Sequence, residues 1–192
     1  MILEGIVTTL NEDGSANVSP MGPLVDREIT RLVLRPYKTS RTYRNLKRVS
    51  KGILHITDDV ELLAHAAVGR FDPPPRLLSH KASGGFLLAD CCRWFAFEVA
   101  TLFDQTDRTT IECQVVDSGS VRDFFGFNRA KHAVVEAAIL ATRIHILPAD
   151  QIQEELARLA IIVDKTAGDQ ERRAFDFLRQ HIEGETKEPV TE

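Results

Sequence analysis

The sequence predicts an α+β fold with an antiparallel sheet or barrel first and helices last. Up to residue 127, β-branched and aromatic runs are separated by turn signals, without the strand–helix–strand alternation of a parallel sheet. After residue 127, three segments in a row carry apolar side chains at helical spacing. With 192 residues, 43% of them hydrophobic, the chain is long enough to bury a core. We therefore expect a β-rich domain (residues 1–127), a helical extension (128–185) and a frayed tail (186–192).

The first 34 residues predict three strands. Residues 2–10 are rich in β-branched side chains, and Asp13-Gly14 then marks a hairpin turn. Residues 15–20 form the return strand, which ends at Pro20. A third strand is expected at residues 29–34, because Pro36 closes another β-branched run.

A short helix is expected next. Thr39 or Ser40 would cap it, and Gly52 would end it. Its apolar face would consist of Tyr43, Leu46 and Val49.

The middle of the chain predicts three further strands and one helix. The strands are expected at residues 53–56, 91–103 and 109–118, and the last two are the longest candidates. Asp58-Asp-Val-Glu61 resembles a capping box and would open the helix. Residues 69–85 are interpreted as a loop, because they contain three consecutive prolines and several glycines.

The C-terminal third predicts three helices, at residues 128–146, 150–165 and 169–183. Asp150 with Gln153 indicates a capping box for the second helix. At the start of the first helix, Arg129, Lys131 and His132 oppose the helix dipole, which favours a nearby anion, either Glu136 or a ligand. Two apolar stripes run along the second and third helices: Ile152, Leu156, Leu159, Ala160 and Val163, then Ala174, Phe175, Leu178 and Ile182.

A segment without acidic residues is the main functional signal. Residues 29–57 contain no Asp or Glu, although the whole chain has a formal net charge of −4. Hydroxyls and cations gather there at the expected helix start, where backbone N–H groups lack partners, and this arrangement favours a phosphate. A solvated surface is the ordinary alternative, and nucleic acid is a weaker one. The cations are Arg31, Arg35, Lys38, Arg41, Arg44, Lys47, Arg48 and Lys51.

Several other functions are disfavoured. No apolar run reaches the roughly 20 residues of a membrane helix. The six histidines show no metal-binding spacing. The three cysteines (Cys91, Cys92 and Cys113) are interpreted as reduced, buried side chains. We therefore expect a cytoplasmic protein without a metal site that binds neither membranes nor nucleic acid.

Two segments of the chain resemble those of a known superfamily. Residues 7–22, which include Asn17, Val18, Ser19, Pro20 and Met21, resemble the opening hairpin of FMN-binding split-barrel proteins. Residues 38–46 and 52–57 resemble the phosphate-binding helix start and the next strand of these proteins. Residues 56–60 and 127–143 extend the similarity to an uncharacterised branch, domain of unknown function 447 (DUF447).

The resemblance implies a six-stranded split barrel with a C-terminal helical extension, and a homodimer with FMN at the subunit interface. The phosphate would be held by Thr39, Ser40 and Thr42, together with Lys38 or Arg41. Residues 17–21 would line the isoalloxazine ring. By its position on the strand after the expected phosphate helix, His55 is a candidate proton donor. The flavin would carry the redox chemistry, so that no catalytic triad is needed.

Three hypotheses for the function follow. The first is a flavin-dependent oxidoreductase, for example a reductase, acting on a small heterocycle such as a pterin and linked to one-carbon metabolism. The second is a non-enzymatic module that binds FMN or another phosphorylated ligand for storage, sensing or assembly. The third is a scaffold whose helical third forms an interface, since residues 133–140 are strongly apolar.

Overall fold

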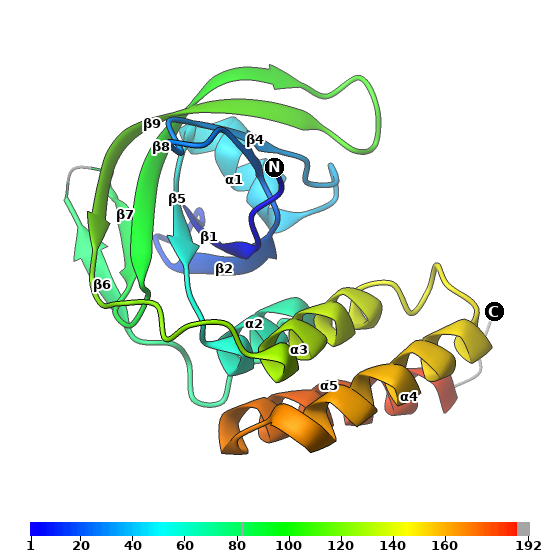
Figure 1. Ribbon diagram of the computed structural model, residues 1–192. Helices are drawn as coiled ribbons and strands as arrows, with labels where there is room; N and C mark the ends of the chain where they lie inside the picture. Colours follow the sequence, from blue (N-terminus) through cyan, green and yellow to red (C-terminus); the bar gives the residue numbers. More distant parts are fainter. Residues whose placement is uncertain (82, 188–192) are drawn as a thin grey trace. The chain divides into compact units, whose positions relative to one another are not determined.

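The computed structural model describes residues 1–81 and 83–187, and the chain forms two compact units (Figure 1). Residues 1–57 and 74–124 form the first, which we call the barrel unit. Residues 58–73 pack with residues 125–187 in the second, which we call the helical unit. The helical unit thus includes a helix that comes before residue 127 in the sequence.

The barrel unit is built on a curled, seven-stranded antiparallel sheet (Figure 1). This sheet and the helices confirm the predicted α+β class. The resemblance implied six strands, and the sheet has seven because a short strand pairs at one edge. The strand order is β2-β1-β5-β8-β9-β4-β3. Their bounds are β1 (Gly5–Leu10), β2 (Ala16–Met21), β3 (Leu24–Val25), β4 (Arg31–Leu34), β5 (Lys51–Ile56), β8 (Arg93–Phe103) and β9 (Thr110–Ser120).

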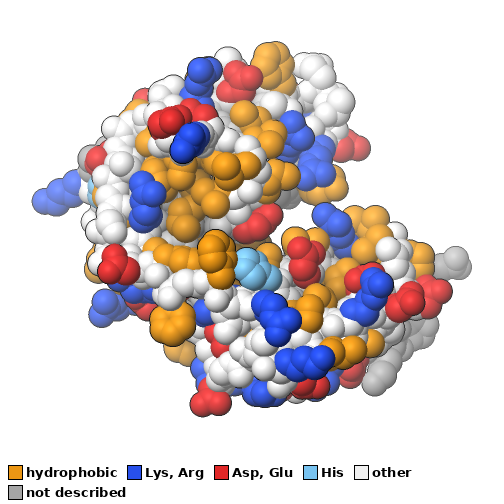
Figure 2. Space-filling model, in the orientation of Figure 1, with side chains coloured by type: hydrophobic (Ala, Val, Ile, Leu, Met, Phe, Trp, Pro, Cys, Tyr) orange, Lys and Arg blue, Asp and Glu red, His pale blue; other side chains and the backbone are white. Residues whose placement is uncertain are grey.

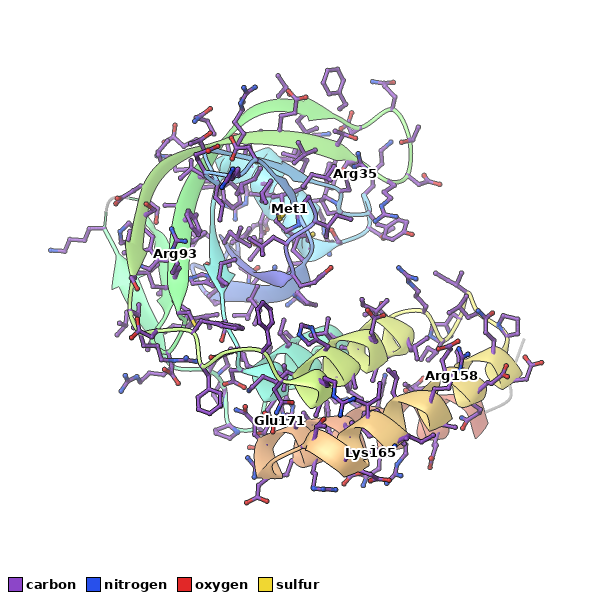
Figure 3. All side chains as sticks on the ribbon, viewed as in Figure 1. Met1, Arg35, Arg93, Arg158, Lys165 and Glu171 are labelled. Atoms are coloured by element: carbon purple, nitrogen blue, oxygen red, sulfur yellow. The ribbon has the colours of Figure 1, made fainter. Side chains whose placement is uncertain are left out.

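The first residues of the chain link the two ends of this sheet. The Leu3 N–H donates to the Pro23 carbonyl at 3.0 Å, and the Val25 N–H donates to the Met1 carbonyl at 2.8 Å. Strand β3 is therefore bonded to the segment that leads into β1, with Met1 on the inner side of the curled sheet (Figure 3). Strand β2 pairs only with β1, so its other edge is free within the sheet.

The predicted loop at residues 69–85 is partly wrong, because a second hairpin forms there. Strands β6 (Leu77–His80) and β7 (Gly85–Leu88) pair with each other, and β7 contacts β1 and β5. The Thr8 hydroxyl donates to the Phe86 carbonyl at 2.7 Å. Tertiary contacts therefore stabilise strands in a stretch whose glycines and prolines predict a loop.

Helix α1 (Arg41–Val49) packs against the barrel core as expected. Tyr43 and Leu46 are buried, and Val49 is partly buried. The helix ends at Ser50, which has a left-handed backbone (φ 58°), rather than at Gly52. Gly52 lies inside β5, where a Cβ would come within 2.6 Å of the Phe97 ring.

The helical unit contains α2 (Val60–Val68), α3 (Arg129–Ala141), α4 (Ala149–Thr166) and α5 (Asp169–Lys187). Asp59 caps α2, since its carboxylate accepts from the Leu62 N–H at 3.0 Å. The predicted capping box at Asp150 is wrong, because α4 begins after Pro148 without a side-chain cap. Both predicted stripes face the core, and their most buried members are Ile152, Leu156, Val163, Ala174, Phe175, Leu178 and Ile182.

A buried ion pair joins two helices of this unit. Lys131 at the start of α3 pairs with Glu171 of α5 at 2.9 Å, and it also donates to the Asp58 carbonyl at 2.7 Å. The anion beside Lys131 is therefore Glu171, and not Glu136 or a ligand as expected from the sequence. None of the helices in the described part of the chain is long and apolar enough to cross a membrane.

Candidate functional site

The start of α1 has free hydrogen-bond donors. Ser40 is the N-cap, which decides between the two predicted candidates, and its hydroxyl accepts from the Tyr43 N–H at 3.2 Å. No acceptor among the described residues lies within bonding distance of the Arg41 and Thr42 N–H groups. These amides lie at the positive end of the helix dipole, where an anion is stabilised.

Five of the eight cations of the acid-free segment fall into two groups. Lys47 and Lys51 are paired, with Asp104 and Glu98 respectively, each at 2.9 Å. The hydrogen bond to Asp104, reinforced by one to the Tyr43 hydroxyl, raises the pKa of Lys47 above its ordinary value. These two lysines are therefore already neutralised by carboxylates from β8 and its turn.

The second group lies at the start of α1. Within the described residues, Lys38, Arg41 and Arg44 form no ion pair. Arg41, Arg44 and Thr39 are exposed, and Lys38 is half-buried. Cations without an ion-pair partner among the described residues therefore lie beside the free amides, which favours binding of a phosphate dianion.

Residues 17–21 lie along β2 and are all half-buried. Because side chains alternate along a strand, Asn17, Ser19 and Met21 face one side, and Val18 and Pro20 face the other. Met21 packs against the hydrophobic core of the barrel unit. The five predicted ring contacts therefore cannot all reach one ligand through their side chains.

The backbone of β2 offers a second kind of contact. The Asn11 N–H donates to the Ser15 carbonyl at 2.8 Å, so these two residues form a hydrogen-bonded pair of the β1–β2 ladder. Hydrogen-bonded pairs alternate with non-hydrogen-bonded pairs along an antiparallel ladder, and by this alternation Val18 belongs to a non-hydrogen-bonded pair. The N–H and carbonyl of Val18 consequently point away from β1, toward the free edge. Pro20, which has no N–H, suits this edge.

A hydrogen bond joins the two predicted segments. The Asn17 amide nitrogen donates to the Thr42 hydroxyl at 3.1 Å and to the Thr9 hydroxyl at 3.2 Å. Thr42 is only 1% exposed, so its side chain connects α1 to β2 beneath the surface. The structure thus brings the expected ring segment and the expected phosphate segment side by side.

Three residues of this hydrogen-bonded cluster were missed from the sequence, namely Thr9, Asn11 and Asn45. Asn45, 4% exposed, donates to the Thr9 hydroxyl at 3.0 Å and to the Asn11 side-chain carbonyl at 2.8 Å. Buried amides need such partners, so this cluster is a built polar network. The available signal was a polar residue one helical turn after Thr42, beside the apolar face of α1.

His55 and the cysteines are unsuited to proton transfer or nucleophilic chemistry. His55 is fully buried; its Nδ1 lies 3.2 Å from the Ile6 carbonyl, and its Nε2 accepts from the Leu88 N–H at 3.2 Å. Burial lowers the pKa of His55 to about 4 and raises the pKa of the Cys91 thiol to about 11. Across residues 1–81 and 83–187, no group of three His, Cys, Asp or Glu side chains could hold a metal ion.

Solved structures with a similar fold define the class of protein. An FMN-bound protein from Methanosarcina mazei matches with a TM-score of 0.80 and 21% identity, over 94% of each chain. A NADH:FAD oxidoreductase from Streptomyces globisporus matches with a TM-score of 0.52 and 14% identity, over 61% of this chain and 69% of its own. The styrene monooxygenase flavin reductase from Pseudomonas putida S12 matches with a TM-score of 0.51 and 16% identity, over 62% of this chain and 82% of its own. The fold is therefore a flavin-reductase-like split barrel carrying a helical extension.

Two family profiles cover most of the chain. The N-terminal domain of the protein of unknown function DUF447 matches residues 3–122, and the second DUF447 profile matches residues 128–180. The chain belongs to the DUF447 family, to which the Methanosarcina protein is also assigned. No match was found among curated proteins.

Proposed function

We propose that this chain binds FMN, with the phosphate at the start of α1 and the isoalloxazine ring along β2. The observation that carries the proposal is the Asn17–Thr42 hydrogen bond, because it fixes a ring-binding strand beside an anion-binding helix start. The FMN-bound DUF447 structure supports the choice of flavin, since its fold matches along nearly the whole chain.

The phosphate end suits a dianion. The helix start is surrounded by Lys38, Thr39, Ser40 and Arg41, where free N–H groups lie beside cations that form no ion pair with the described residues. Thr42 belongs to the same site, because its hydroxyl holds Asn17. Figure 2 shows hydrophobic side chains gathered on one face of the barrel unit, bordered by Lys and Arg as well as by Asp and Glu.

The ring end offers polar and apolar contacts. Val18 presents backbone groups at the free edge, Asn17 and Ser19 present side chains, and Met21 supplies a soft apolar contact beside Pro20. Bound FMN supplies hydride or electron transfer. The chain's own residues bind the cofactor and orient its ring.

The activity that we propose is that of a flavin-dependent oxidoreductase acting on a small heterocycle of pterin-like type, in one-carbon metabolism. Flavin reductases among the structural neighbours support the reaction class. We also propose a cytoplasmic homodimer with FMN at the subunit interface. The exposed side chains of Tyr37 (51%) and Phe103 (60%) on the barrel unit support such an interface.

A non-enzymatic FMN module is the second candidate function. It is favoured by the burial of His55, which leaves the histidine of β5 unable to donate a proton to a ligand. The two candidates differ in one measurement, since only an oxidoreductase bleaches its bound flavin with NAD(P)H or a reduced partner at a useful rate.

FMN titration followed by flavin fluorescence tests the proposal. We expect saturable binding near one FMN per chain. Arg41→Gln should weaken it about tenfold, because a charge-assisted bond contributes about 1.5 kcal/mol or more. Arg27→Gln is the matched control, since Arg27 is also exposed and forms no ion pair with any described residue. No binding, or equal effects of the two substitutions, would contradict the phosphate site.

A further inference from the structure

The carboxamide of Asn17 has a defined orientation. Both of its N–H hydrogens are used, one by the Thr9 hydroxyl and one by the Thr42 hydroxyl. Each of these hydroxyls is buried, at 4% and 1% exposure, so water does not replace them. The amide nitrogen therefore faces the protein interior.

Asn45 stabilises this orientation through a shared acceptor. Its amide donates to the same Thr9 hydroxyl oxygen that accepts from Asn17. Its second N–H is held by Asn11 in the turn of the β1–β2 hairpin. Asn45 thus fixes the position of the Thr9 hydroxyl between two amide donors.

The remaining polar atom of Asn17 is its carbonyl oxygen. None of the described residues donates a hydrogen bond to it, and the residue is half-buried on a strand whose other edge is free. A carbonyl oxygen only accepts hydrogen bonds, so a ligand group that meets it must be a donor. On an oxidised isoalloxazine ring, the imide N3–H is the single N–H donor.

We infer that Asn17 is a specificity-determining residue whose carbonyl oxygen accepts the imide N–H of the flavin ring, and that Asn45 is a positioning residue that orients it. This inference rests on the proposed FMN site. It adds which protein atom forms a hydrogen bond with the ring edge and which buried amide orients that atom. A ligand without this N–H would leave the half-buried carbonyl oxygen of Asn17 without a hydrogen bond. This loss costs binding free energy, which makes the contact selective.

The test compares FMN with N3-methyl-FMN, which lacks the N–H. The wild-type protein should bind FMN about tenfold or more tightly than the methylated analogue. Asn17→Ala should weaken FMN and bring the affinity ratio close to one. Gln105→Ala is the control, because this exposed carboxamide makes no hydrogen bond with the described residues and should leave the ratio unchanged.

Asn45→Ala tests the positioning role. We expect its affinity ratio to fall toward one as well, while a purely structural role would lower both affinities and leave the ratio intact. Equal binding of the two flavins by the wild-type protein, or an unchanged ratio in Asn17→Ala, would overturn the inference. If the wild-type protein binds neither flavin, the proposed function itself fails, which is a distinguishable result. Asn17 lies half-exposed on an edge strand, so Asn17→Ala remains informative if Asn45→Ala does not fold.

Discussion

Acidification should destabilise the barrel unit through His55. This side chain is fully buried between β1, β5 and β7, and both ring nitrogens are bonded to backbone groups as a neutral imidazole requires. Burial lowers its pKa from 6.5 to about 4, although the Ile6 carbonyl opposes this shift. The unfolded chain therefore takes up a proton at a higher pH than the folded chain does.

The size of the effect follows from the two pKa values. The contribution of His55 to stability is fully present above pH 6.5, and it is lost as the pH falls from 6.5 toward 4. Over the whole range the loss of stability amounts to about 3 kcal/mol, because each unit of difference between the pKa values of the folded and unfolded states contributes about 1.4 kcal/mol. Between pH 7 and pH 5 it amounts to about 2 kcal/mol.

Urea unfolding at pH 7, 6 and 5 measures this loss. Trp94, the single tryptophan, pairs with His55 across β5 and β8, so its fluorescence reports on the same part of the sheet. His55→Gln is the comparison, because an amide does not titrate. The free energy of unfolding should fall by about 2 kcal/mol more in the wild-type protein than in the variant. Equal pH dependence in the two proteins would refute the reasoning.

Two further substitutions test the packing. Gly5→Ala should destabilise the barrel unit by about 1–3 kcal/mol in urea unfolding, because its Cβ would lie 2.5 Å from the His55 carbonyl oxygen. Gly184→Ala is the control: this glycine lies in an open helical position, so the substitution should stabilise α5 slightly. A stabilising effect of Gly5→Ala would contradict the close strand contact. Lys131→Met should destabilise the helical unit by about 3–5 kcal/mol, seen as an early loss of helical circular dichroism on heating, because Glu171 would remain buried without its partner. A loss below 1 kcal/mol would show that Glu171 finds other compensation.

Local signals in the sequence predicted much of the fold. The turn at Asp13-Gly14 gave the β1–β2 hairpin, in which Gly14 has a positive φ of 82°. Apolar side chains at helical spacing predicted α4 and α5. These signals work because turns and helix faces depend on residues a few positions apart. The acid-free segment likewise pointed to the start of α1, whose free amides follow from local helix geometry.

Residues distant in the sequence decided the rest. Strands β6 and β7 form because Thr8 and His55 bond to the β7 backbone, and nothing within residues 69–85 indicates this. Lys47 is neutralised by Asp104, although acids are absent from its own segment.

The candidate site shows the same division. The sequence by itself determined which two segments carry hydroxyl, amide and basic side chains. Only the tertiary structure decided that Asn17 bonds to Thr42 and that Asn45 holds Thr9, 36 residues away. The physical reason is that a buried amide must find its partners wherever the folded chain supplies them, and sequence spacing does not specify those partners.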